Sequence, residues 1–160
     1  MDYLVFATYL AACSGAAATG AVFSPGPWYR ALKKPVWTPK DWMFPVVWTT
    51  LYFLMAGAAM IASQEEGSRL ALALWALQIT LNTLWTPIFF GLRRIRAGML
   101  VMTFLWLAVA ATTVSLATLS TTAGLLFLPY LLWVTIAGAL NFWVMLNNPD
   151  TGYDGAVSGA

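Results

Sequence analysis

The side chains with chemical potential inside the apolar part of this chain are aromatic rings and amides. Phe44, Trp48 and Tyr52 repeat every four residues and therefore share one face of a helix. Such faces can line an apolar cavity, in which amide groups orient a ligand through a few hydrogen bonds. A ligand-binding cavity is therefore one interpretation of the pattern. Two further faces carry the same kinds of side chain at helical spacing: Gln78, Asn82, Trp85 and Phe89, and then Trp133, Ala137, Leu140 and Asn141.

Ordinary helix packing is the alternative interpretation of these faces. Trp and Phe often fill helix interfaces, and a buried Asn or Gln in a membrane span commonly bonds to a neighbouring helix. Pro87 and Pro129 lie within apolar runs, where each favours a kink that shapes either packing or a cavity. The residues alone leave both interpretations open.

Conventional catalytic groups are missing from the apolar runs. The chain has no histidine and one cysteine, Cys13, which excludes an intramolecular disulfide and most His/Cys schemes for metal or haem ligation. All six acidic residues lie in connectors or termini, and no Lys or Arg lies in the middle of an apolar run. We therefore predict no metal site, no acid–base or nucleophilic catalysis, and no ion-coupled carrier. Nothing in the sequence indicates nucleic-acid binding.

Composition assigns the chain to the membrane proteins. Of its 160 residues 61% are hydrophobic and 9% are charged, whereas soluble domains carry about 25% charged residues. An apolar run of about 20 residues crosses a bilayer as a helix. We predict an all-α membrane protein in which residues 1–147 form a five transmembrane helix bundle and residues 148–160 form a disordered tail. The predicted spans cover residues 3–23, 44–62, 70–90, 97–119 and 123–146.

The first span has two further features. Ala12, Ala16 and Gly20 recur every four residues, a spacing that permits close helix approach, within the bundle or at a dimer face. Leu10-Ala11-Ala12-Cys13 resembles a lipoprotein cleavage box. The preceding residues contain Asp2 and no basic residue, which disfavours a removable signal.

The first connector, Trp28 to Tyr52 including the start of the second span, is rich in Trp and basic residues. Pro35 and Pro39 favour a stiff, non-helical loop that enters the next helix at Pro45. Trp side chains and lysines of this kind suit a membrane surface or an anionic ligand, and Trp37 is a candidate contact. The basic residues of this loop are Arg30, Lys33, Lys34 and Lys40.

Charge sets the relative orientation of the connectors. The first connector carries four and the third carries three, that is seven, of the eight Lys and Arg residues, and only Arg69 lies on the other side. The first and third loops and the C-terminus should therefore share one side, which is cytoplasmic if the host is an inner membrane. The sequence does not decide between an inner and an outer membrane.

Five motifs in order resemble the TspO/MBR family, the tryptophan-rich sensory proteins and translocator proteins, also called the peripheral-type benzodiazepine receptor family. The resemblance covers roughly residues 3 to 147 and suggests a bacterial member. The motifs are Trp28-Tyr29, Lys34-Pro35-x-Trp37-x-Pro39, WTTLY from Trp48, NTLWTPIFFG from Asn82, and PYLLW from Pro129 through Leu140-Asn141-Phe142.

The resemblance implies a homodimer of five-helix subunits that binds tetrapyrroles such as protoporphyrin IX and haem. It further implies binding of lipids or sterols and of isoquinoline- or benzodiazepine-type drugs, with no required cofactor. The family's pocket opens beneath the first loop, and some bacterial members promote light-dependent breakdown of protoporphyrin IX, for which the matching residues are Trp48 and Trp133. The residues that match the pocket lining are Trp48, Asn82, Phe90, Trp133, Ala137 and Leu140.

Two departures from the family pattern bear on these expectations. The loop reads Trp37-Thr38-Pro39-Lys40 where many members have two consecutive prolines. The end of the fifth span reads Leu140-Asn141-Phe142-Trp143, without the tyrosine and the following basic residue of the sterol-recognition pattern. We therefore expect weaker cholesterol binding than in mitochondrial members.

Three functions remain open from the sequence. The first is tetrapyrrole binding in transport or regulation, with Arg30, Lys33 or Lys34 pairing with ligand propionates. The second is light- and oxygen-dependent degradation of protoporphyrin IX, and the third is an oligomeric scaffold or stress sensor without a transported substrate. The candidate ligand-binding residues are Trp37, Trp48, Tyr52, Asn82, Trp85, Phe90, Trp133, Ala137 and Leu140.

Overall fold

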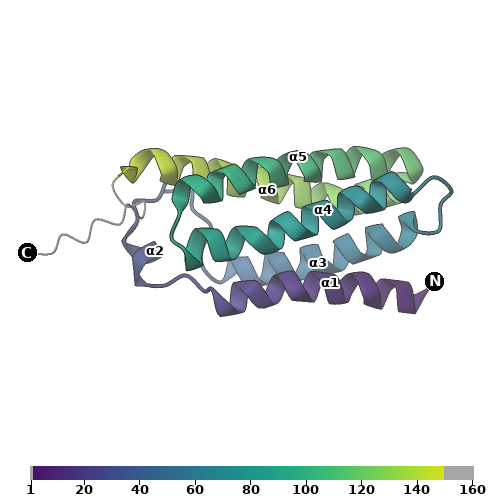
Figure 1. The fold of residues 1–160 in the computed structure, drawn as a ribbon, viewed down its shortest axis with the longest axis horizontal. Helices are drawn as coiled ribbons and strands as arrows, with labels where there is room; N and C mark the ends of the chain where they lie inside the picture. Colours follow the sequence, from purple (N-terminus) through teal and green to yellow (C-terminus); the bar gives the residue numbers. More distant parts are fainter. Residues whose placement is uncertain (1, 150–160) are drawn as a thin grey trace, which may run out of the picture.

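Residues 2–149 are described by a computed structural model, in which the long helices lie side by side (Figure 1). Five of these helices are long and apolar enough to cross a membrane, which confirms the predicted five-span membrane bundle. The elements are α1 (Tyr3–Val22), α2 (Pro27–Ala31), α3 (Met43–Ala62), α4 (Arg69–Thr86), the π-helical turn η1 (Pro87–Gly91), α5 (Ile95–Leu119) and α6 (Thr121–Asn147).

The helix ends follow from local capping. The Asp2 carboxylate accepts hydrogen bonds from the backbone N–H groups of Leu4 and Val5, so α1 begins at Tyr3. Ser120 alone separates α5 from α6, because its hydroxyl caps the new helix through the N–H of Ala123. The last connection is therefore shorter than the expected turn over residues 120–122.

The first loop contains a short helix that the sequence analysis did not predict. Helix α2 begins with Pro27 at its first position, where the missing N–H of proline costs nothing and its fixed φ suits a helix. The prediction of a non-helical segment was therefore wrong for Trp28 to Ala31. Helix α3 begins at Met43, one residue before the predicted start of the second span at residue 44.

Pro87 does more than kink a straight helix. The chain widens into the π-helical turn η1, and the N–H of Leu92 donates to the carbonyl of Pro87 at 2.8 Å. The extra residue in this turn changes the direction of the side chains that follow. Phe89 is buried and stacks on Trp85, with ring centroids 5.0 Å apart, whereas Phe90 packs edge-on against both rings.

One end of the bundle gathers α2, η1 and the end of α6, while α1 begins at the opposite end (Figure 1). Asn148 joins these segments: its Oδ1 accepts from the N–H of Lys33 at 2.9 Å, and its Nδ2 donates to the Lys33 carbonyl at 3.0 Å. Asn148 is thus buried against the first loop, although the sequence analysis assigns it to the tail. Residues 150–160 of that predicted tail lie outside the described residues.

Candidate ligand-binding site

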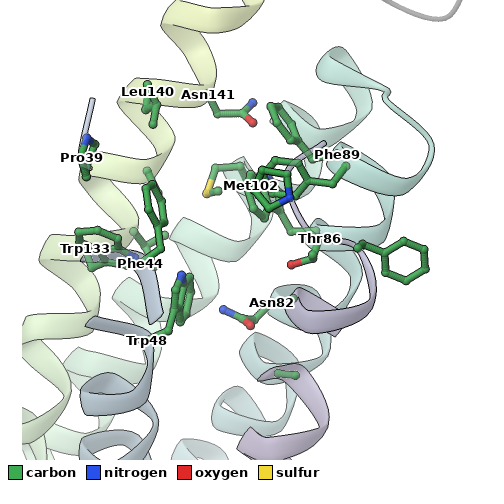
Figure 2. A pocket seen from close by; sticks show the side chains of 18 of the residues that line it. Pro39, Phe44, Trp48, Asn82, Thr86, Phe89, Met102, Trp133, Leu140 and Asn141 are labelled. Carbon is green, nitrogen blue, oxygen red and sulfur yellow. The ribbon is translucent and has the colours of Figure 1, made fainter. Parts of the chain in front are cut away.

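A cavity of about 630 Å³ lies inside the bundle beneath the first loop. Small-molecule sites in proteins commonly have volumes of about 300–1,000 Å³. Figure 2 shows Phe44, Trp48 and Trp133 on one side of the cavity and Asn82, Thr86 and Phe89 on the other. The cavity therefore has the size and the aromatic walls expected of a site for a flat apolar molecule.

The structure brings most of the predicted site residues together. Helices α3, α4 and α6 each turn one face of aromatic and polar side chains toward the same cavity. The predicted residues that line the cavity are Trp48, Tyr52, Asn82, Trp85, Phe90, Trp133, Ala137 and Leu140.

Trp37 is the exception among the predicted residues. It lies in a tight turn in which both the N–H and the hydroxyl of Thr38 donate to the carbonyl of Pro35, at 3.0 and 2.6 Å. Its side chain is 48% exposed and does not line the cavity. Trp37 is therefore not part of the cavity wall, and its contact with a ligand stays a prediction.

The wall formed by α3 and α6 is held by aromatic contacts. Trp48 stacks on Tyr52 with ring centroids 5.4 Å apart and meets the edge of Tyr130 at 6.0 Å. Phe44 packs edge-on against Trp133 at 5.7 Å. Such pairs favour defined ring orientations, so the wall is preorganised for stacking.

Asn82 is fixed between two tyrosines. The hydroxyl of Tyr52 donates to Asn82 Oδ1 at 3.3 Å, and Asn82 Nδ2 donates to the hydroxyl of Tyr130 at 2.9 Å. This chain of bonds links α3, α4 and α6, so Asn82 serves as interhelical glue as well as cavity wall. The sequence left open whether the amide lines a cavity or bonds to a neighbouring helix, and Asn82 does both.

Three buried polar atoms of lining residues have no hydrogen-bond partner within residues 2–149: Trp85 Nε1, Trp133 Nε1 and Asn141 Oδ1. A buried polar group without a partner costs free energy, which a ligand can recover by bonding to it. These atoms have almost no accessible surface, so a ligand would reach the two indole N–H donors and the amide acceptor only after side-chain movement.

Gln78, predicted on the same face as Asn82, does not line the cavity. It lies one turn further from the first loop and has no exposed surface. Both of its amide atoms lack a partner among the described residues. Of the two roles that the sequence left open for Gln78, a place in the cavity wall is thus not the one observed.

The sequence analysis missed several residues around the cavity. Ala16 and Gly20 of α1 and Met102 of α5 line it, and so do Tyr29 and Asp41 from the first loop. The small-residue spacing on α1 did signal close approach, and the structure places two of its members at the cavity. Nothing in the sequence indicated that Met102 lines a cavity, because a single Met in an apolar helix is typical of any hydrophobic core.

The basic residues of the first loop do not line the cavity. Lys34 in particular is engaged elsewhere: its Nζ donates to the carbonyls of Tyr29, Arg30 and Leu32 at 2.7, 3.2 and 3.0 Å. These bonds satisfy carbonyls at the end of α2, where a cation is favoured. All three N–H donors of Lys34 are thereby used, so it is not free to pair with a ligand propionate.

Tyr29 lies at the loop end of the cavity, next to acidic Asp41. Burial, and then the nearby negative charge of Asp41, raise the pKa of the Tyr29 phenol above its ordinary value. Its ring contacts Phe90 edge-on at 5.2 Å and Phe89 at 6.3 Å. Tyr29 therefore presents a neutral, mostly apolar surface beside the carboxylate.

Comparison with known proteins agrees with this architecture. The TspO/MBR family pattern matches residues 4–146. The chain is 54% identical to Protein CrtK of Rhodobacter capsulatus over 93% of this chain and 96% of that protein. It is 51% identical to the tryptophan-rich sensory protein of Cereibacter sphaeroides over 92% of this chain and 94% of that protein.

A more distant similarity extends to animals. The chain is 36% identical to the human translocator protein over 76% of this chain and 75% of that protein. The pattern match and both bacterial similarities span nearly the whole chain and all five membrane helices. This integral membrane protein therefore belongs to the TspO/MBR family.

Proposed function

We propose that this protein binds the tetrapyrroles protoporphyrin IX or haem and thereby acts in the transport or the regulation of these pigments. The observation that carries the proposal is the convergence of three aromatic helix faces on one cavity of about 630 Å³ beneath the first loop. A flat macrocycle stacks well on Trp48 and Trp133, and the indole N–H groups of Trp85 and Trp133 can donate to its polar edge. Membership in the TspO/MBR family supports the same ligand class.

The proposal requires no iron ligand. The chain has no histidine, and the lining residues offer aromatic and amide groups instead. Binding would therefore depend on the macrocycle, and metal-free protoporphyrin IX should bind about as tightly as haem.

Sterols and isoquinoline- or benzodiazepine-type drugs are further proposed ligands of the same apolar cavity. A homodimer is the proposed assembly.

The test is a titration of the purified protein with protoporphyrin IX in the dark, followed by tryptophan fluorescence. Trp48→Phe and Trp133→Phe should each weaken saturable quenching, because each removes an indole from the cavity wall. Trp106→Phe is the matched control: this Trp lies in α5, donates to Thr135 Oγ1 at 2.9 Å and does not line the cavity. Equal affinity in all four proteins would contradict tetrapyrrole binding in this cavity.

A second candidate function is light- and oxygen-dependent degradation of protoporphyrin IX. It is favoured by the oxidisable indoles of Trp48 and Trp133 at the cavity and by the stacking of Trp48 on Tyr52 at 5.4 Å. Illumination in air should then bleach the bound pigment faster than the free pigment, and Trp48→Phe should slow this bleaching. Bleaching that proceeds equally under argon would contradict an oxygen-dependent reaction.

A further inference from the structure

The cavity contains one charged lining residue among those described, and that residue is acidic. Asp41 lines the cavity from the first loop, just before α3 begins, and its side chain is exposed to solvent. The remaining lining residues are apolar or neutral polar, such as Thr49 and Asn82. A ligand that enters from the loop end therefore meets a carboxylate.

No compensating cation lies in the cavity wall among residues 2–149. Lys34 is bound to three backbone carbonyls. Arg30, Lys33 and Lys40 are exposed on the loop and do not line the cavity. The net charge of the loop is positive, but the charge that faces the ligand is negative.

Asp41 is exposed, so water and salt screen part of its charge, and its field acts on groups held close to it at the loop end of the cavity. Tyr29 lies within this field: its pKa is raised first by burial and then by the negative charge of Asp41. An anionic group held in the cavity near Tyr29 would experience the same unfavourable field.

Asn141, near the end of α6, adds a polar group to the same cavity. Asn141 is 3% exposed, lines the cavity, and its Oδ1 has no partner within the described part of the chain. The other end of this amide is fixed, because Nδ2 donates to Met99 Sδ at 3.3 Å. Asp41 and Asn141 therefore present acceptors, which are satisfied by donor groups and not by carboxylates, whereas the unpartnered donors of the lining are the indole N–H groups of Trp85 and Trp133.

We infer that Asp41 is a specificity-determining residue, which makes the cavity favour neutral or cationic flat ligands over anionic ligands of the same shape. The inference deepens the proposed function and rests on use of the same cavity. For a porphyrin with two propionates, it means that the carboxylates either lie outside the cavity mouth or bind in protonated form. Esterified or amine-bearing ligands meet no such obstacle.

The test compares protoporphyrin IX with its dimethyl ester in a non-ionic detergent at low salt. The wild type should bind the ester more tightly than the diacid. Asp41→Asn should tighten binding of the diacid by about two- to fivefold, as expected for a partly exposed charge pair, and leave the ester unchanged. Asp2→Asn is the matched control, because it removes the same charge at the opposite end of the bundle and retains a capping side chain.

A second pair of probes separates this inference from tetrapyrrole binding. A tricyclic aromatic amine and a tricyclic carboxylic acid of the same size are titrated into wild type and Asp41→Asn. If the substitution lowers the preference for the amine while neither porphyrin binds, the charge selectivity holds and the tetrapyrrole proposal fails. If Asp41→Asn changes neither preference, in porphyrins or in tricyclic probes, the role of Asp41 is overturned.

Discussion

The side-chain amide of Asn82 donates to the hydroxyl of Tyr130 at 2.9 Å and so joins α4 to α6 inside the membrane-spanning bundle. Tyr130 has no exposed surface and Asn82 is 6% exposed. Tyr52 completes the link by donating to the other end of the same amide. The floor of the cavity is therefore held by hydrogen bonds, while its walls are held by aromatic packing.

Replacement of Asn82 by Ala should lower stability by about 1–3 kcal/mol, because it leaves the hydroxyls of Tyr52 and Tyr130 without this partner. The measurement is thermal unfolding in detergent. Thr80→Ala is the control, since its exposed hydroxyl bonds only to the Ala76 carbonyl within the same helix. A double mutant with Tyr130→Phe should lose less than the sum of the single changes. Additive losses would show that the bond contributes little.

Gly124→Ala should destabilise the α5–α6 hairpin. A Cβ at Gly124 would lie 2.6 Å from the Cβ and 2.8 Å from the Cα of Ala117, a contact that only backbone movement relieves. Overpacking of this kind costs about 1–3 kcal/mol. Gly15→Ala on α1 is the matched control, because nothing lies within 4 Å of its Cβ position. The control should be neutral or more stable by about 0.5–1 kcal/mol. Equal melting temperatures for the two variants would contradict the close approach at Gly124.

Tyr29 should make stability depend on alkaline pH. Burial, and then Asp41, raise its pKa above the ordinary value of 10.0 in the folded protein. The folded state therefore retains this proton at a pH where the unfolded chain has lost it, so stability is full below pH 10 and falls as pH rises beyond it.

The measurement for Tyr29 is the free energy of unfolding in denaturant between pH 9 and pH 11, for wild type and Tyr29→Phe. Other tyrosines titrate in both proteins, so the difference between the two curves isolates Tyr29. Above pH 10, the free energy of unfolding should fall less steeply with pH for Tyr29→Phe than for the wild type. Asp41→Asn should retain most of the wild-type dependence, because burial is the larger cause. Parallel curves would contradict this assignment.

Asn148→Ala should loosen the first loop. Its side chain bonds both backbone groups of Lys33 and also donates to the Val144 carbonyl at 2.8 Å, which ties the loop to the end of α6. Amide exchange at Lys33 should become faster, and ligand dissociation should accelerate if the loop covers the cavity. Asn147→Ala is the control, because Asn147 Nδ2 donates to the Trp143 carbonyl of its own helix. Unchanged exchange at Lys33 in Asn148→Ala would show that other contacts hold the loop.

The sequence predicted the spans well for a simple reason. Crossing a bilayer requires about 20 apolar residues in a helix, because backbone groups in lipid must bond to one another. Leu70 to Phe90 therefore predicted the third span closely, although Pro87 turns its last residues into a π-helix. Helical periodicity likewise predicted the faces of Trp48, Asn82 and Trp133, because side chains four residues apart share a side.

The five-span bundle and the aromatic faces could be predicted from the sequence, since both follow from local composition and helical geometry. Which side chains meet was settled by tertiary packing. It placed Asn82 between two tyrosines, left Trp37 at the surface, used the donors of Lys34 within its own loop, and put Asp41 at the cavity. These outcomes depend on the relative rotation of helices and the path of the first loop. Such arrangements arise from packing between residues far apart in the chain, which local periodicity does not encode.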